Sequence, residues 1–257
     1  MTGSRPGGTL TLAGVTVARL GLGTMRLTGP GTWDDPTDRV GAVRLLRHAV
    51  DSGINHIDTA DAYGPHTVED LIRWALHPYS DDLLIATKVG MVRPAPNVWH
   101  PLGRPEYLRA AVEASLRRLA VERIGLCYLH RVDPTVLLAD QVGTLAELQQ
   151  EGKIGAIGLS KVTVDQIEQA RATIPIDAVQ NVLNLDEPDD PALEHCHDLG
   201  IPYIPYRPLN AGRHTGPDGA AKALRHLLDR GPHVAPIPGT SNRGHLDELI
   251  AAVTQET

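Results

Sequence analysis

The chain has 257 residues, of which 42% are hydrophobic and 21% are charged, as is ordinary for a globular protein. That length fits either one large α/β domain or two small domains. The net charge of −7 argues against a nonspecific polyanion binder, so we expect no nucleic-acid partner. Because no apolar run approaches the ~20 residues of a membrane-spanning helix, we expect no membrane partner either.

The two cysteines, Cys127 and Cys196, have no spacing typical of a metal site, so the sequence predicts no bound metal. Cys127 lies in an apolar run and Cys196 on a predicted helix, and a buried reduced thiol is the expected state of each. Residues 1–8 contain no apolar segment of a secretory signal, and we expect them to be disordered. Together these features predict a cytoplasmic protein.

A β-hairpin is the first predicted element, because Thr9–Leu12 and Val15–Val17 flank the turn residues Ala13 and Gly14. A buried strand follows at residues 20–23. Its Gly-x-Gly pattern lacks a third glycine and does not open a helix directly, so it is a weak indication of a dinucleotide-binding loop.

Beyond the hairpin, short apolar segments alternate with segments of helical periodicity. The predicted strands begin at Leu20, His56, Leu83, Ile124, Ile154, Ala178, Tyr203 and Val234. The predicted helices span residues 38–52, 67–76, 104–119, 134–150, 164–173, 191–199, 219–229 and 242–253. Strict alternation indicates a parallel sheet, and eight units fit one (β/α)8 TIM barrel over residues 1–257. A doubly wound open sheet competes, but it would normally show a glycine-rich phosphate loop after its first strand.

Ionisable side chains gather at the ends of three consecutive predicted strands. Asp58 ends one strand and is followed by Tyr63, while Lys88 and His130 end the next two. The carboxyl ends of barrel strands form the active site, so these residues are expected to meet there. A buried lysine needs a partner, and Asp58 is the natural one for Lys88. The adjacent ammonium should lower the pKa of Tyr63, so that the phenol donates a proton to a carbonyl oxygen that His130 orients.

Ordered sequence blocks at these strand ends resemble those of the aldo-keto reductase family, and the match runs over nearly the whole chain. The three catalytic blocks are Asn55–Gly64, Ala86–Lys88 and Leu129–Pro134. The cofactor blocks are Gly152–Ile154, Ile157–Ser160, Val179–Asn181, Tyr206–Leu209 and Ile237–Ser241. Three further segments are similar to the bacterial pyridoxal reductase branch: Thr28–Gly31, Tyr63–His66 and Pro78–Asp82.

The resemblance implies a (β/α)8 barrel whose N-terminal hairpin closes the bottom, and reduction of aldehydes or ketones with NADPH, NADH being possible. It implies that Tyr63 is the general acid tuned by Lys88 and Asp58, and that His130 orients the carbonyl. The residues implied to bind the cofactor are Thr24, Met25, Ser160, Gln180, Tyr206, Arg207, Pro208, Leu209, Thr240, Ser241, His245 and Glu248. Arg26 and Trp99 are expected to line the pocket of the small carbonyl substrate.

Some positions depart from the family pattern. Lys161 stands where asparagine usually follows the serine, and it either alters the nicotinamide site or turns outward to solvent. Arg207 replaces a common serine, and Leu249 replaces an asparagine that usually contacts adenine. Only one helix fits between Tyr206 and Val234, and no covering tail follows the last helix, so we expect an open pocket or an apolar patch.

These departures keep other functions open. One is a barrel that uses the same acid/base cluster for a non-redox dehydration, cyclisation or isomerisation. Another is a cofactor-retaining sensor. The sequence also leaves open whether the protein is a monomer or a homo-oligomer.

Overall fold

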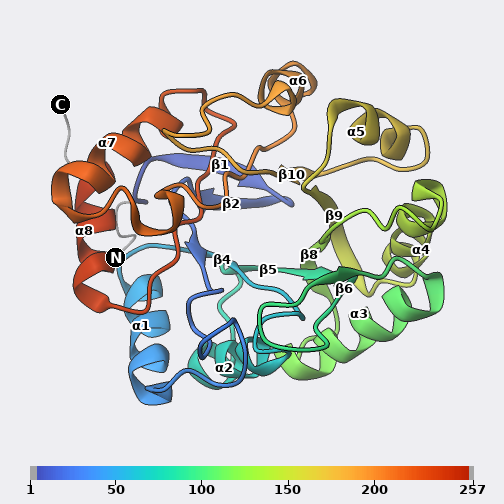
Figure 1. The fold of residues 1–257 in the computed structure, drawn as a ribbon, viewed down its shortest axis with the longest axis horizontal. Coiled ribbons are helices and arrows are strands. Elements are labelled where there is room, and N and C mark those ends of the chain that lie inside the picture. Colours follow the sequence, from blue (N-terminus) through green and yellow to red (C-terminus); the bar gives the residue numbers. More distant parts are fainter. Residues whose placement is uncertain (1–4, 255–257) are drawn as a thin grey trace.

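The protein, described here by a computed structural model over residues 5–254, contains a curled parallel sheet surrounded by helices (Figure 1). Six strands are hydrogen-bonded in the order β10-β9-β8-β5-β4-β3. Their bounds are β3 Leu22–Gly23, β4 His56–Asp58, β5 Leu84–Val89, β8 Ile124–Leu129, β9 Ile154–Ser160 and β10 Ala178–Gln180. All neighbouring pairs in this sheet are parallel, as strand–helix alternation predicts.

Two irregular segments close the barrel between β10 and β3. Tyr203 bridges Val179 on one side and Val234 on the other, and Gly239 bridges Gly23. The predicted strands 203–206 and 234–237 therefore occupy their expected places but are not regular strands. The reason is proline, which has no N–H to donate to a ladder. The two segments contain Pro205 and Pro236 and are flanked by Pro202 and Pro238.

The helices lie close to their predicted positions. They are α1 Arg39–Asp51, α2 Thr67–Leu76, α3 Pro105–Leu119, α4 Leu138–Gln150, α5 Val164–Arg171, α6 Pro191–Leu199, α7 Gly216–Leu228 and α8 Arg243–Thr254. The start predicted for α4, at residue 134, is wrong. The Asp133 carboxylate accepts hydrogen bonds from the backbone N–H and the hydroxyl of Thr135, which holds a turn before the helix. No helix within residues 5–254 combines the length and apolar character needed to cross a membrane.

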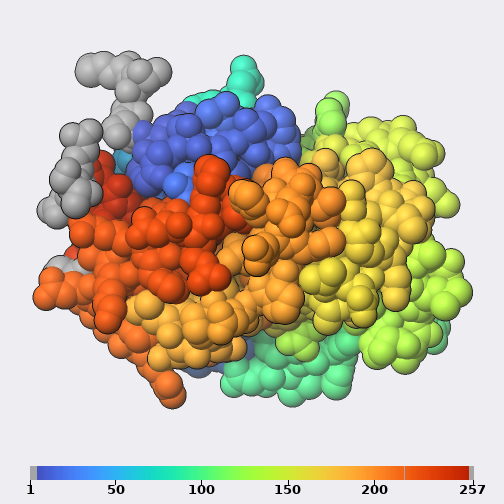
Figure 2. Space-filling model, turned by 90° about the horizontal axis from the view of Figure 1, so that it is seen from above, coloured from blue at the N-terminus to red at the C-terminus, as the bar shows by residue number. Residues whose placement is uncertain are grey.

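The N-terminal hairpin, β1 Thr9–Leu12 and β2 Val15–Ala18, closes one end of the barrel. Leu12 and Val17 are fully buried in one cluster with the strand residues Leu84 and Leu126. In Figure 2 this segment, in dark blue, lies at the surface against the orange and red C-terminal third of the chain. Arg19 links the hairpin to the C-terminal third by donating hydrogen bonds to the carbonyl oxygens of Leu228 and Val234.

The prediction that residues 1–8 are disordered is wrong for residues 5–8; residues 1–4 lie outside the described part of the chain. Arg5 pairs with Asp82 at 2.6 Å, and the carbonyl oxygen of Pro6 accepts a hydrogen bond from Leu20 N–H. Pro6 is itself buried. These contacts reach distant parts of the sequence, so local composition does not reveal them.

Barrel strand β4 carries a histidine in the interior. His56 is fully buried, and neither ring nitrogen has a hydrogen-bond partner within residues 5–254. Burial lowers the pKa of His56 from 6.5 to about 4, against the attraction of Asp58. The folded protein therefore holds this imidazole in its neutral form at neutral pH.

His56 should make stability depend on pH. The unfolded chain takes up a proton near pH 6.5, whereas the folded chain resists protonation until about pH 4. The contribution of His56 to the free energy of unfolding is therefore highest above pH 6.5, where its imidazole is neutral in both states. It falls by about 3 kcal/mol as the pH falls towards 4. We expect urea unfolding of His56→Leu to show a weaker loss over that range than the wild type. Parallel stability curves for the two proteins would contradict the assignment.

Candidate active site

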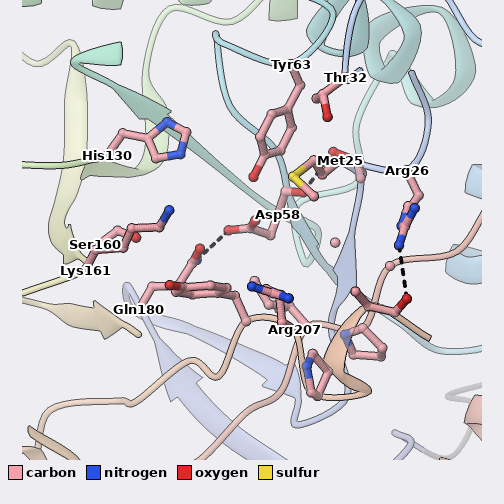
Figure 3. Close-up of a pocket in the computed structure, with 18 of the residues that line it drawn as sticks. Met25, Arg26, Thr32, Asp58, Tyr63, His130, Ser160, Lys161, Gln180 and Arg207 are labelled. Carbon is pink, nitrogen blue, oxygen red and sulfur yellow. Dashed lines mark hydrogen bonds between the residues drawn. The ribbon is translucent and has the colours of Figure 1, made fainter. Parts of the chain in front are cut away.

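A cavity of about 470 Å3 lies at the carboxyl ends of the barrel strands (Figure 3). Most residues predicted for the site line it. These are Thr24, Met25, Arg26, Asp58, Tyr63, Trp99, His130, Ser160, Gln180, Tyr206, Arg207, Pro208 and Leu209. The structure thus brings together side chains that are up to 185 positions apart in the chain, as between Thr24 and Leu209, because parallel barrel strands end at one rim.

A buried ion pair lies against the cavity: Asp58 lines it, whereas its partner Lys88 is not among the lining residues. Lys88 Nζ lies 2.5 Å from Asp58 Oδ1 and also donates to the carbonyl oxygen of Thr59. Gln180 Nε2 donates to the other carboxylate oxygen of Asp58 at 2.7 Å. Burial acts to lower the pKa of Lys88, but the charge of Asp58, together with hydrogen bonds to Asp58 and Tyr63, outweighs it and raises that pKa. Lys88 is therefore charged and has a partner of opposite charge.

Tyr63 lies above this ion pair, in the loop after β4. Its ring centre is 5.3 Å from Lys88 Nζ, and its hydroxyl points toward Asp58 in Figure 3. The predicted lowering of the Tyr63 pKa is wrong for the protein without bound cofactor. Burial raises the pKa of Tyr63 and exceeds the opposing effect of Lys88, because the side chain is only 7% exposed. Tyr63 therefore keeps its proton at neutral pH.

The rings of Tyr63, Trp99 and His130 together form one wall of the cavity. The centroids of Tyr63 and His130 are 6.1 Å apart, and Trp99 lies 6.4 Å and 6.2 Å from them, each pair edge to face. Burial and then the charge of Lys88 lower the pKa of His130 well below its usual value. A neutral imidazole is thus available to donate one hydrogen bond without adding charge.

The opposite wall combines Ser160, Gln180, Tyr206 and Lys161. Ser160 and Gln180 are paired neighbours at the ends of β9 and β10. Since the amide nitrogen of Gln180 is engaged by Asp58, its carbonyl oxygen is left as an acceptor. Lys161 does not turn away from the site: it lines the cavity, with Nζ 5.4 Å from the centre of the Tyr206 ring.

The remaining candidates lie beyond the cavity, at the start of α8. Thr240 accepts a hydrogen bond from Asn242 N–H, and Asn242 in turn caps α8 by accepting from His245 N–H. Ser241 and His245 are exposed, and Glu248 is half-buried. None of the four predicted residues Thr240, Ser241, His245 and Glu248 lines the cavity itself.

Comparison with known proteins decides the family. Residues 19–221 match the family model for the aldo/keto reductase family, which is well over half of the chain. The protein belongs to the aldo/keto reductase family.

Relatives agree with this placement. An uncharacterized oxidoreductase of Schizosaccharomyces pombe is 44% identical over 95% of this chain and 84% of its own length. The pyridoxine 4-dehydrogenase of Escherichia coli is 42% identical over 95% of this chain and 92% of its own. The solved structure of a glycerol dehydrogenase from Gluconobacter oxydans superposes with a TM-score of 0.85 at 26% identity, covering 98% of this chain and 91% of that one.

As an aldo/keto reductase, the protein is an oxidoreductase that reduces small carbonyl compounds with a nicotinamide cofactor, which in this family is NADP(H). The predicted family, barrel fold and enzyme class are confirmed. The non-redox alternative is not favoured, because both curated relatives are named as redox enzymes.

One departure from the family pattern has a structural explanation. Leu249 is only 2% exposed and lies in the same core cluster as Leu246 and Ala252. Its replacement of a polar residue therefore fills the core of this reductase and does not alter the cavity wall.

The sequence reasoning missed several cavity residues of this reductase. They are Thr32, Met91, Asn97, Arg131 and Ala211. Arg131 could have been found from its place directly after His130 at a strand end. Thr32 and Asn97 lie in long loops whose path depends on tertiary contacts, whereas Met91 lies in the short strand β6 (Met91–Val92) and Ala211 in a 3-10 helix (Asn210–Gly212).

Arg93 makes tertiary contacts of this kind, and the sequence did not predict its role. Its buried guanidinium donates to the carbonyl oxygens of Thr32, Ala62 and Val98 and lies 3.6 Å from the centre of the Trp99 ring. A planar fork of donors can reach several acceptors at once. Arg93 therefore joins three loops around the catalytic end of the cavity.

Proposed function

We propose that this reductase converts an aldehyde to an alcohol with NADPH, with Tyr63 as the proton donor. The observation that carries the proposal is the buried contact of Asp58 with Lys88 beside the Tyr63 phenol, where Asp58 and Tyr63 line the cavity. NADPH, when bound, supplies the hydride that adds to the carbonyl carbon. Tyr63 gives its proton to the carbonyl oxygen, which becomes the hydroxyl of the product.

The neighbours of Tyr63 have separate roles in this proposal. Lys88 lies close enough to stabilise the phenolate left behind after proton transfer. Asp58 holds Lys88 charged, and Gln180 fixes the second carboxylate oxygen. Neutral His130 donates to the substrate oxygen and so orients the carbonyl toward Tyr63.

The chemistry of the opposite wall fits a nicotinamide carboxamide. Such a group offers N–H donors and one carbonyl acceptor, which match the free oxygen of Gln180 and the hydroxyl of Ser160. The Tyr206 ring lines the same part of the cavity and supports stacking of the nicotinamide. We assign the nicotinamide end to these three residues.

The phosphates and adenine would lie along the adjoining rim. Residues Arg207 to Leu209 and the first turn of α8 follow the last two strand positions of the barrel, where phosphate groups commonly bind at a helix N-terminus. Arg207, Arg243 and His245 are the candidate cations for a 2′-phosphate, which is why we propose NADPH rather than NADH. The other residues proposed for the cofactor are Thr24, Met25, Pro208, Leu209, Thr240, Ser241 and Glu248.

The substrate proposed is an aldehyde on an aromatic ring. Tyr63, Trp99 and His130 offer ring edges about the carbonyl position, and Arg26 lies at the mouth. The relative named pyridoxine 4-dehydrogenase makes pyridoxal the first aldehyde to test.

We also propose that residues 1–257 form one domain, which is supported by the closed barrel and by the hairpin packed into its end. A cytoplasmic location is supported by two buried cysteines that are not joined in a disulfide.

The proposal is tested by following loss of reduced-cofactor absorbance with the purified protein. Pyridoxal and benzaldehyde should each be reduced with saturation kinetics, with NADPH giving the higher kcat/KM than NADH. Failure of both cofactors to bind, monitored by quenching of tryptophan fluorescence, would refute it. Binding without turnover of any aldehyde would refute the assigned reaction alone.

A further inference from the structure

The cavity is lined by more positive charge than the proposed chemistry uses. Four cationic side chains face it: Arg26, Arg131, Lys161 and Arg207. Asp58 is the one carboxylate among the lining residues that the structure describes, and it is already occupied by Lys88 and Gln180. A cavity with this charge pattern is suited to an anionic ligand.

Two of these cations stand together on one wall. Arg131 lies two residues after the end of β8, next to His130, and Lys161 directly follows the neighbouring strand β9. Figure 3 shows the Lys161 amine directed along the wall into the cavity. Arg131 Nε is buried without a hydrogen-bond partner, and neither side chain forms a salt bridge with any residue from 5 to 254. A buried donor without a partner is costly, so a ligand that satisfies it gains affinity.

The cofactor phosphates do not account for this pair. The proposed phosphate-binding residues, from Arg207 to Leu209 and the start of α8, follow the last two strand positions of the barrel. β8 and β9 are the fourth and fifth of eight positions counted from β3, so Arg131 is three positions and Lys161 two positions from the nearer of the last two. Arg207 remains on the cofactor side, and Arg26 lies at the mouth of the cavity.

The pair instead lies near His130, the residue proposed to orient the carbonyl. After burial and Lys88, the charges of Lys161 and Arg131 each contribute to lowering the pKa of His130. Burial and then the charge of Arg131 lower the pKa of Lys161 to about 8. Two like charges therefore repel one another beside the residue that orients the substrate, and an anion placed between them would relieve that repulsion.

We propose that Arg131 and Lys161 bind an anionic group, a carboxylate or a phosphate, carried by the aldehyde substrate. This assignment rests on the proposed aldehyde reduction and defines its substrate class. Charge-assisted hydrogen bonds are the strongest of the polar contacts available to a ligand. We expect the charged group to raise kcat/KM by at least about tenfold over an uncharged counterpart.

Lys161 offers a substitution that should not disturb the fold. Its backbone has a φ of 57°, in the left-handed region that disfavours most side chains but accommodates asparagine. Lys161→Asn therefore removes the charge without adding backbone strain. Arg131→Gln removes the second charge and keeps a polar side chain of similar length.

The test compares three aldehydes with NADPH: 4-carboxybenzaldehyde, 4-formylphenyl phosphate and the uncharged methyl 4-formylbenzoate. In the wild type, at least one charged aldehyde should exceed the ester in kcat/KM by about tenfold or more. The better of the two charged compounds identifies the anion. That ratio should fall several-fold in Lys161→Asn and in Arg131→Gln and should approach one in the double variant. Lys222→Asn, an exposed lysine of α7 outside the cavity, should leave every value unchanged.

A wild-type ratio near one, or a ratio that the variants leave intact, would overturn the assignment of the anion site. Continued turnover of the ester in that case would keep the aldehyde reductase itself in place. If no aldehyde, the ester included, is reduced by the wild type, the proposed function fails together with its substrate class.

Discussion

Replacing Tyr63 with phenylalanine should lower kcat for aldehyde reduction by roughly 10²–10⁴-fold. The variant removes the proposed proton donor while keeping the ring that packs against Trp99 and His130. Because burial raises the pKa of Tyr63, the wild-type phenol stays protonated through neutral pH, and its rate should decline only in alkaline solution. Steady-state kinetics across pH, with NADPH affinity measured by fluorescence, would separate lost chemistry from lost binding.

Tyr79→Phe is the matched control for this experiment. The Tyr79 hydroxyl donates to the carbonyl oxygen of Leu119, outside the cavity. Its removal should cost about 1 kcal/mol of stability and leave kcat unchanged. If Tyr63→Phe retained a rate within a few-fold of the wild type, another group would have to supply the proton.

Replacing Lys88 with methionine should abolish activity and also destabilise the fold by about 3–5 kcal/mol. Lys88 and Asp58 are 1% and 2% exposed and 2.5 Å apart, so removal of one charge leaves the other buried without compensation. The expected loss is far larger than for a surface ion pair. Urea unfolding monitored by tryptophan fluorescence would measure it.

A double substitution separates the two effects of Lys88. In Asp58→Asn/Lys88→Met neither charge remains, so most of the lost stability should return while activity stays absent. Lys153→Met, which removes a lysine from an exposed cluster with Glu113 and Glu151, should change stability little. A single Lys88→Met variant as stable as the wild type would show that Asp58 is neutralised by another route.

Much of the fold and half of the site are legible from the sequence, because both depend on local patterns. Helical periodicity locates α2 and α6 to the residue. Strand ends are marked where an apolar run meets a polar residue, and in a parallel barrel all strand ends meet at one rim. The grouping of Asp58, Tyr63, Lys88 and His130 follows from that geometry.

Contacts between distant residues were not legible in the same way. The prolines of the last two strand positions leave single bridges in place of regular strands. The hydrogen bond from Gln180 to Asp58 spans 122 positions, and it decides which atom of Gln180 is free for a ligand.

The sequence by itself determined the order of strands and helices, the family and the set of candidate catalytic side chains, because each has a local signature. How deeply each side chain is buried, and which way it points, were decided only by the tertiary structure. It buries Tyr63 enough to raise its pKa, against the expectation drawn from Lys88 alone. It also places Leu249 in the core and directs Lys161 into the cavity beside Arg131. Desolvation and the distance between charges depend on every neighbouring element at once, and no local pattern encodes them.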